Sequence, residues 1–399
     1  MMGKKKTIGL AACVLGLVAG LSAASEPTFL PPQQYAVGGG GWGPTNIVAG
    51  DFNRDGRFDL ATTYRYHDNV TVLYGLSGGG YGQREDYSVG AVGPYYSYGL
   101  AADDLNHTGR LDLVVSCSSC DKIAVLPSLQ GGGFGPHQDY AAAGYSLDLV
   151  TGDFGGPIQK DIAVCSFHTS GVGVFYGKVG GGFDAPQPHA TGNDTNGMIA
   201  YDMNRDGRLD LVAPNYGSDS VTVLYGQQGG GFGFRQDYEV GDHPHYVAAG
   251  DFNGDGLADM AVSNHYGHSI TLLYGQPGGT LGDRQDYPLD LLPFGIVAAD
   301  FDGDSRLDLA VASYGGTLAL LRGLPSGGFG LREDYPLGEV LNDVVVADFN
   351  GDGGLDLAVL NHTGESINVL LNAIPEPATL SLLALGGLAL LHRRRGASS

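Results

Sequence analysis

Seven acidic loops recur along the chain, and their residue types suit a divalent cation. The first contains Asp51, Asn53, Asp55, Gly56 and Asp59. Oxygen-bearing side chains on alternate residues of a tight loop converge on one point, while a glycine at the sixth place permits the turn. The seventh residue can add its carbonyl oxygen. Hard oxygen ligands in this number favour Ca²⁺.

Six of the seven loops carry such a ligand set, so we expect about six calcium sites. The expected ligands are Asp51, Asn53, Asp55, Asp59, Asp104, Asn106, Thr108, Asp112, Asp202, Asn204, Asp206, Asp210, Asp251, Asn253, Asp255, Asp259, Asp300, Asp302, Asp304, Asp308, Asp348, Asn350, Asp352 and Asp356. Two alternatives are that the acids are only soluble turn residues, and that bound calcium only locks the hairpins without any direct part in binding or chemistry.

The loops depart from one another in ways that affect the metal. The second has Thr108 in place of one carboxylate and should bind more weakly, whereas the sixth has four acids and Ser305 at the glycine place. The third has Gly155 and Pro157 where ligands are expected, so we expect it to be empty. An EF-hand would need a glutamate at the twelfth place and a following helix, but strand-forming residues such as Val262 stand there.

The loops are spaced by one repeating unit. The aspartates that open them lie at 51, 104, 153, 202, 251, 300 and 348, and four of the six intervals are 49 residues. Each unit has four short β-prone runs between glycine-rich turns, which predicts one four-stranded antiparallel sheet. We therefore expect an all-β, seven-bladed β-propeller over residues 29–372. The N-terminal strand, Phe29 to Val37, should complete the last blade and remove exposed edges.

Connections in such a blade alternate between two faces. The acidic loops should share one face with the glycine-rich turns, and we call this the calcium face. The variable loops before each first strand and after each second strand form the other, which we call the variable-loop face. It carries many aromatic residues, and exposed aromatics are typical anchors for ligands. We expect ligand contacts from Trp42, Tyr96, Tyr216, His245 and Tyr266; Tyr64, Tyr246, Phe294 and Tyr314 occupy similar places. The alternative is that some of these rings plug the axial channel.

Two further clusters have competing explanations. His243, His245, His265 and His268 lie around the fifth blade, where they either hold a transition metal or form ordinary hydrogen bonds to loop backbone. Cys117 and Cys120 fall in one hairpin loop, and a local disulfide is plausible in an exported protein, with Cys165 nearby in register.

Composition limits the partners. The chain has 21 basic and 43 acidic residues, a net charge of −22, which repels phosphate backbones and argues against nucleic-acid binding. Glycine makes up 68 of 399 residues without a G-X-Y period, and 43% of residues are hydrophobic, which argues against collagen and disordered linkers. We expect a monomer that binds cations.

Both ends of the chain look like targeting segments. Residues 1–24 combine a basic head, an apolar run and small residues, which predicts a signal peptide cut by signal peptidase. At the other end, residues 374–399 hold Pro375, Glu376 and Pro377, an apolar stretch, and Arg393, Arg394 and Arg395. This order resembles the PEP-CTERM sorting signal of Gram-negative bacteria. The resemblance implies export, transient anchoring by a transmembrane helix, and cleavage by an exosortase; a permanent membrane anchor is the alternative.

The repeat itself resembles the FG-GAP (VCBS) family, the unit of the integrin α-subunit propeller. The likeness rests on Gly-Phe-Gly at 231–233 and on Ala-Gly-Asp-Phe-Asn at 49–53 and 249–253. It implies a propeller with calcium loops in β-hairpins.

We therefore expect an exported, calcium-stabilised propeller that serves as a non-catalytic binding or adhesion module. Its place would be the cell surface or the extracellular polysaccharide matrix, with a polysaccharide or a surface protein as ligand. The alternative is an extracellular enzyme, a polysaccharide lyase or lipase-like, because some relatives of the family are enzymes. Gly75 to Gly79 fits the G-x-S-x-G pattern, but it lies in a hairpin turn instead of a strand-to-helix elbow.

Overall fold

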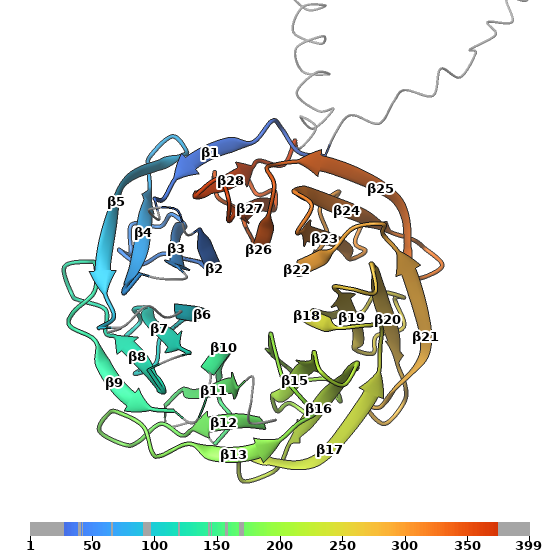
Figure 1. The fold of residues 1–399 in the computed structure, drawn as a ribbon, viewed down its shortest axis with the longest axis horizontal. Coiled ribbons are helices and arrows are strands. Elements are labelled where there is room, and N and C mark those ends of the chain that lie inside the picture. The colour runs from blue at the N-terminus through green and yellow to red at the C-terminus, as the bar shows by residue number, and fades with distance from the viewer. Residues whose placement is uncertain are drawn as a thin grey trace, which may run out of the picture.

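The computed structural model describes residues 28–373 except 39–40, 42, 65–66, 91–96, 119, 143, 145, 156–158 and 167–170. Its strands form seven antiparallel sheets of four strands, arranged around a common axis (Figure 1). The expected all-β, seven-bladed propeller is confirmed. The expected signal peptide and the sorting segment at 374–399 lie outside the described residues.

Each sheet is one blade, and the blades are numbered in chain order. Blade 1 contains β2 (Pro44–Gly50), β3 (Asp59–Tyr64), β4 (Asn69–Gly75) and β5 (Tyr81–Ser88). Blade 2 contains β6 (Ser97–Asp103), β7 (Asp112–Cys117), β8 (Lys122–Leu126) and β9 (Gln138–Ala141). Blade 3 contains β10 (Ser146–Gly152), β11 (Asp161–Ser166), β12 (Gly171–Phe175) and β13 (Gln187–Ala190). Blade 4 contains β14 (Ile199–Tyr201), β15 (Asp210–Asn215), β16 (Ser220–Gly226) and β17 (Phe232–Glu239).

The last three blades follow the same plan. Blade 5 contains β18 (Pro244–Gly250), β19 (Asp259–Asn264), β20 (Ser269–Gly275) and β21 (Leu281–Pro288). Blade 6 contains β22 (Pro293–Ala299), β23 (Asp308–Ser313), β24 (Thr317–Gly323) and β25 (Phe329–Pro336). Blade 7 contains β26 (Leu341–Ala347), β27 (Asp356–Asn361), β28 (Ser366–Leu370) and, from the other end of the chain, β1 (Gln33–Ala36).

The core lies between successive blades. In the second strand of blade 5, Met260 and Val262 pack against side chains of blade 4, whereas Ala261 packs against blade 6. Because successive side chains of a strand point to opposite faces, a strand sandwiched between two neighbours must be apolar at every position. The fourth strands lie at the rim and are mostly exposed and polar, as in β21.

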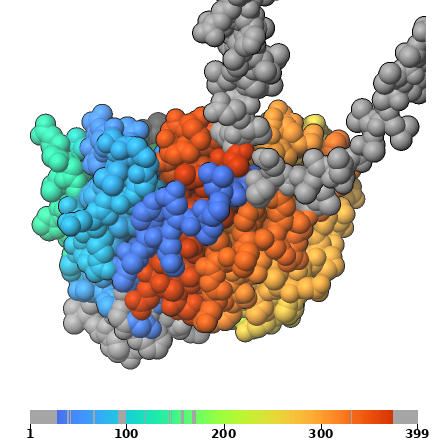
Figure 2. All heavy atoms as spheres, turned by 90° about the horizontal axis from the view of Figure 1, so that it is seen from above, coloured from blue at the N-terminus to red at the C-terminus, as the bar shows by residue number. Residues whose placement is uncertain are grey.

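The N-terminal strand closes the ring, as expected. β1 pairs antiparallel with β28, with Gln33 opposite Val369 and Ala36 opposite Ser366. Phe29 makes an isolated bridge with Asn372 and packs against Phe301. Figure 2 shows this N-terminal segment in blue, lying across the blades that end the chain. The two ends together thus rebuild the turn that is continuous in the other blades.

A bulge in the innermost strand lines the axis of the propeller. In six blades the first strand places two residues opposite one of the second strand, for example between Pro44 and Ile47. The residue five places before each loop aspartate forms an axial ring, which is Asn46, Gly99, Asp148, Gly197, Tyr246, Gly295 and Asp343 from blade 1 to blade 7. The Tyr246 hydroxyl of blade 5 lies close to the Asn46 side chain of blade 1. Because these blades are not neighbours, the Tyr246 side chain crosses the axis.

Small and large residues alternate around the axial ring. In blades 2, 4 and 6 it is a glycine, and a Cβ on Gly295 would lie 2.8 Å from the Asp343 Cα of the next blade. The two ring aspartates instead reach the next blade with their carboxylates. Asp148 accepts from the Met198 N–H at 3.0 Å and Asp343 from the Ile47 N–H at 3.1 Å. Burial raises the pKa of Asp148 to about 6 and that of Asp343 to about 7.

The ring glycines are therefore required by close approach of backbone. We expect Gly295→Ala to lower the free energy of unfolding by about 1–3 kcal/mol, because neither backbone can move away without shifting a blade. Gly131→Ala is the matched control, since nothing lies within 4 Å of its Cβ position. Urea unfolding of the two variants measures the difference, and equal stabilities would contradict the role assigned to the ring.

Candidate calcium loops and ligand-binding face

The last aspartate of each acidic loop is buried and clamps its blade. In blade 5, Asp259 is fully buried, and its Oδ2 and Oδ1 accept from the Phe252 and Gly275 N–H groups, both at 2.7 Å. The equivalent residues are Asp59, Asp112, Asp161, Asp210, Asp308 and Asp356. Burial raises the pKa of Asp59, Asp210 and Asp356 to about 6. Each clamp joins the acidic loop to the end of the third strand.

The first aspartate of the loop shapes the turn. Asp251 accepts from the Asp255 N–H at 3.2 Å through Oδ1 and from the Gly256 N–H at 2.8 Å through Oδ2. The same two bonds are made by Asp51, Asp104, Asp202, Asp300 and Asp348. Six loops therefore share one closed conformation.

In one of these loops the structure brings carboxylate oxygens as close together as a cation site needs. In the sixth loop, where every expected ligand is an acid, carboxylate oxygens of Asp300, Asp302 and Asp304 lie within 4.8 Å of one another. Each carboxylate oxygen that accepts one N–H keeps a further lone pair for a cation. The donor set is entirely oxygen, so the six loops fit Ca²⁺.

The third loop does not fit. Gly155 supplies no side-chain ligand, and its N–H donates to the clamp residue Asp161 at 2.5 Å. The Asp153 carboxylate lies 3.3 Å from the Lys160 ammonium group, which neutralises it in place of a metal ion. Pro157 lies outside the described residues. The blade nevertheless keeps its clamp.

Arginine side chains neutralise an aspartate in some of the acidic loops. In loops 1, 4 and 6 the seventh residue is an arginine that pairs with the fifth-place aspartate and donates through Nε to a carbonyl at the end of the third strand. These pairs are Arg57 with Asp55, Arg208 with Asp206 and Arg306 with Asp304. Loops 5 and 7 have Leu257 and Gly354 at that place.

A second arginine ties the sixth loop to the closure of the ring. Arg322 Nη1 lies 2.6 Å from an Asp302 carboxylate oxygen and Nη2 lies 2.9 Å from Glu333. Nη2 also donates to the Thr28 hydroxyl, at the N-terminal end of the described chain. The sixth loop, which has more acids than any other, is thus paired with one additional arginine. The same Arg322 side chain also holds the N-terminal segment.

Acidic loops and glycine-rich turns lie on the same face, as expected. A Cβ on Gly327, in the turn of blade 6, would lie 2.9 Å from Asn253 of the loop of blade 5. The phenylalanine that follows this turn, Phe329, packs edge-on against Phe252 with ring centroids 5.5 Å apart. Phe134 and Phe52 make the same contact between blades 2 and 1 at 5.7 Å. The calcium face is therefore occupied by contacts between blades.

Aromatic side chains gather on the variable-loop face of blades 4 to 6. Tyr266 is 52% exposed and Tyr314 is 48% exposed. The Tyr216 ring centroid lies 6.4 Å from that of Tyr266, and burial, followed by the hydrogen bond of the Tyr216 hydroxyl with Tyr266, raises the pKa of Tyr216 to about 12. His265 is buried below them, 4.8 Å from Tyr266 and 5.9 Å from Tyr314.

The other expected ligand contacts have different outcomes. Trp42 and Tyr96 lie outside the described residues. His245 contacts the Phe294 ring at 3.8 Å and Asn196 at 3.1 Å, and burial lowers its pKa to about 3. Tyr64, one of the aromatics expected on this face, is not an exposed anchor, because only 2% of it is accessible and its hydroxyl donates to the Val37 carbonyl at 3.0 Å.

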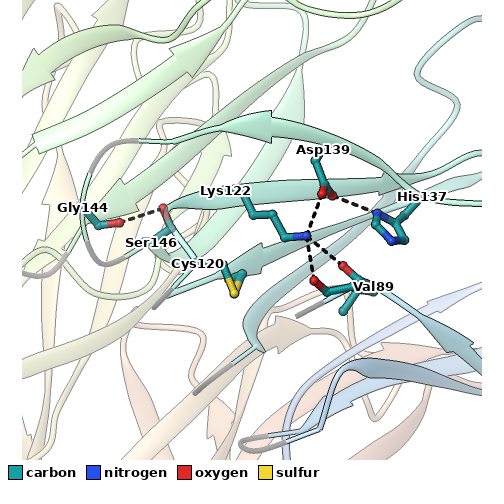
Figure 3. The surroundings of a disulfide bond; sticks show 9 residues. Val89, Cys120, Lys122, His137, Asp139, Gly144 and Ser146 are labelled. Carbon is teal, nitrogen blue, oxygen red and sulfur yellow. Dashed lines mark hydrogen bonds and ion pairs between the residues drawn. A yellow bond between two sulfur atoms is a disulfide. The ribbon is translucent and has the colours of Figure 1, made fainter. Parts of the chain in front are cut away.

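The structure joins Cys117 and Cys120 in a disulfide. Figure 3 shows its surroundings, where Lys122 contacts Asp139 at 2.8 Å and the Val89 carbonyl at 3.2 Å. Cys165 is a free, buried thiol whose sulfur accepts from the Asp148 N–H at 3.3 Å. The disulfide closes the hairpin of blade 2, and Lys122 fastens that hairpin to the end of blade 1.

The repeating loops match a known family. The FG-GAP-like repeat matches residues 202–262, 251–311 and 300–359, each of which spans the acidic loops of two successive blades. Residues 202–359 of the seven-bladed propeller are FG-GAP-like repeats. None of the curated protein sequences is similar to it.

The chain also carries the PEP-CTERM protein-sorting motif, which matches residues 373–395. It is therefore an exported protein that is sorted to the cell envelope. All of that motif except Ala373 lies outside the described residues, and within the described ones no helix is long and apolar enough to cross a membrane.

Solved structures share the fold of this propeller. One is BBS1N in complex with ARL6DN, at 10% identity and a TM-score of 0.59, covering 88% of this chain and 98% of that one. Another is an Agrocybe aegerita lectin described as recognising non-reducing terminal N-acetylglucosamine. It is 18% identical with a TM-score of 0.52, covering 81% of this chain and 87% of the lectin. At these identities the likeness shows the fold alone.

Two features of the propeller escaped sequence reasoning. The axial ring had a signal in the sequence, since its members stand at one fixed distance before each loop aspartate. Arg322 also had one, because it replaces the tyrosine found at Tyr274 in the blade before it. Neither pattern shows which residues are in contact, because those contacts form only when the seven blades close into a ring.

Blade 3 allows the stabilising effect of the buried clamp aspartate, Asp161, to be measured apart from metal binding, because its loop does not fit calcium. We expect Asp161→Ala to lower the free energy of unfolding by about 2–5 kcal/mol, because it leaves buried N–H groups without an acceptor. The loss should be the same with calcium and with chelator. Asp153→Ala removes only a partly exposed ion pair and should cost under about 1 kcal/mol. Denaturant unfolding in both solutions measures this, and equal losses for the two variants would contradict the clamp.

Proposed function

We propose that the propeller is a calcium-binding, non-catalytic binding or adhesion module at the cell surface or in the extracellular polysaccharide matrix. The observation that carries this proposal is the contrast between its faces. The calcium face is filled by acidic loops and turns that contact neighbouring blades, whereas the variable-loop face presents Tyr216, Tyr266 and Tyr314 to solvent or near it.

Calcium is proposed from the shared loop conformation. Six loops hold the same closed turn and offer only oxygen atoms, which are the ligands that Ca²⁺ prefers. A divalent cation would also reduce the repulsion within a chain of net charge −22. Bound calcium would then stiffen the loops on which the turns of the next blade rest.

A polysaccharide or a surface protein is the proposed ligand. Tyrosine rings offer a large contact area, and their hydroxyl groups can hydrogen-bond a sugar or a peptide. The strongly negative charge favours neutral partners over acidic ones. A lectin with the same fold recognises a terminal sugar, which is consistent with a propeller of this kind serving in recognition.

Processing completes the proposal. Signal peptidase would remove residues 1–24, and the C-terminal segment would anchor the chain transiently until an exosortase cuts near Pro375 to Pro377. β28 ends at Leu370, so few residues separate the last blade from the cut. The mature protein would then act as a monomer.

Calcium removal should destabilise the protein, since a ligand that binds only the folded state stabilises it by mass action. We expect a lower melting temperature in chelator than in millimolar Ca²⁺. By calorimetric titration, Asp251→Ala should bind about one ion fewer, whereas Asp153→Ala should bind as many as the unaltered chain. Equal melting temperatures in the two solutions would contradict calcium binding.

The variable-loop face should carry the ligand. We expect Tyr216→Ala together with Tyr266→Ala to abolish retention on a glycan or protein array, with little loss of stability. Phe234→Ala is the matched control, because Phe234 is 61% exposed on the outermost strand of blade 4. Phe134→Ala, on the calcium face, should reduce stability by about 3–5 kcal/mol while the folded fraction still binds. Loss of binding in Phe234→Ala, or its retention in the double variant, would refute this assignment, and shortening of a bound polymer would indicate a lyase.

A further inference from the structure

A second kind of metal site lies on the variable-loop face, away from the acidic loops. Asp219 ends the hairpin loop between β15 and β16, and Asp242 and His243 lie in the connection from blade 4 to blade 5. Ligand atoms of these three side chains all lie within 4.8 Å of one another. The ring nitrogen Nδ1 of His243 is 2.6 Å from Asp242 Oδ1. The backbone N–H of His243 donates to Asp219 Oδ1 at 2.9 Å.

The loops that hold these side chains are fastened to one another. The Val240 N–H donates to the Asp219 carbonyl at 3.0 Å, the His265 N–H to the His243 carbonyl at 3.0 Å, and the Gly267 N–H to the Asp242 carbonyl at 3.1 Å. Three loops from two blades thus form one hydrogen-bonded unit. A site on such a unit loses little conformational entropy when it binds a ligand.

The imidazole is also held in place by its neighbours. The His243 ring lies edge-on to Tyr216 at 4.4 Å and to Tyr266 at 5.0 Å. His245 and His265, by contrast, are engaged elsewhere, with Asn196 and with the Pro293 carbonyl. Of the histidines grouped by sequence, the structure therefore selects His243 and supplies it with two carboxylates.

Charge at this cluster is not balanced by the protein. Among the ion pairs of the described residues, Asp242 pairs only with His243, and Asp219 pairs with neither lysine nor arginine. Two carboxylates this close repel one another, and a bound cation would relieve that repulsion. The acidic loops are different, since their expected ligands are all oxygen atoms, and the one histidine within them, His107, does not stand at a ligand position.

We infer that Asp219, Asp242 and His243 form a site for a first-row transition-metal ion, of which Zn²⁺ is the best match. Zinc accepts both imidazole nitrogen and carboxylate oxygen at roughly 2.0–2.2 Å, and the exposed aspartates can rotate to reach these lengths. Three protein ligands leave a coordination position open. That position would lie beside Tyr216 and Tyr266, so the ion could contact whatever binds this face.

Zinc titration of the tag-free, calcium-saturated protein tests this site. We expect one Zn²⁺ per chain by isothermal titration calorimetry, with affinity reduced about 10-fold or more in His243→Ala and in Asp219→Asn. His268→Ala is the matched control, because His268 is exposed on the adjacent hairpin loop and should bind zinc like the unaltered chain. Melting curves of each variant in calcium establish that it is folded.

Each result decides the assignment. Absence of saturable zinc binding, or an unchanged affinity in His243→Ala, would overturn it. Loss in Asp219→Asn with full binding in His243→Ala would show an oxygen-only site and would also overturn it. The calcium proposal is tested separately, because the melting temperature of His243→Ala should still fall when calcium is removed.

Discussion

The buried aspartate that closes each acidic loop is the interaction on which the fold depends. Its two oxygens accept N–H groups from the start of the loop and from the end of the third strand, so one carboxylate joins three strands of a blade. It is found in all seven blades and is at most 2% exposed. Removing its charge from water is costly, and the paired backbone donors offset that cost. Blade 3 shows that the clamp does not require a calcium loop, because it keeps Asp161 although its loop lacks the ligands.

Closure of the ring imposes the second constraint. An odd number of blades cannot alternate small and large axial residues throughout, and at the junction of blades 7 and 1 two larger residues, Asp343 and Asn46, follow one another. There the Asp343 carboxylate accepts the Ile47 N–H, which joins the last blade to the first. At the rim, Phe29 and Thr28 rebuild the missing turn, and Arg322 holds Thr28. The junction is therefore fastened near the axis and at the rim.

Most of the architecture could be predicted from the sequence because it is periodic. Each strand, turn and acidic loop recurs seven times, so an error in one repeat is corrected by the others, and the closing role of Phe29 to Val37 follows from the missing strand of the last repeat. What could not be predicted are contacts between non-adjacent segments. The sequence places Tyr64 and Tyr246 in variable loops, but they lie in β3 and β18, where one is buried against Val37 and the other reaches Asn46 across the axis. The grouping of Asp219 with His243 likewise depends on how two blades meet.

The acidic loops differ in whether an arginine neutralises the fifth-place aspartate, and five of them fall into two groups. In loops 1, 4 and 6 an arginine already neutralises the fifth-place aspartate, and in loop 6 Arg322 also binds Asp302. Loops 5 and 7 have no such arginine. Without a cation, their carboxylates repel one another with least relief from the protein. Loop 5 contacts the turn of blade 6, where a Cβ on Gly327 would lie 2.9 Å from Asn253, so repulsion in that loop acts on the contact between blades 5 and 6. Calcium would therefore relieve most repulsion in loops 5 and 7, while the arginine-compensated loops can hold their shape without it.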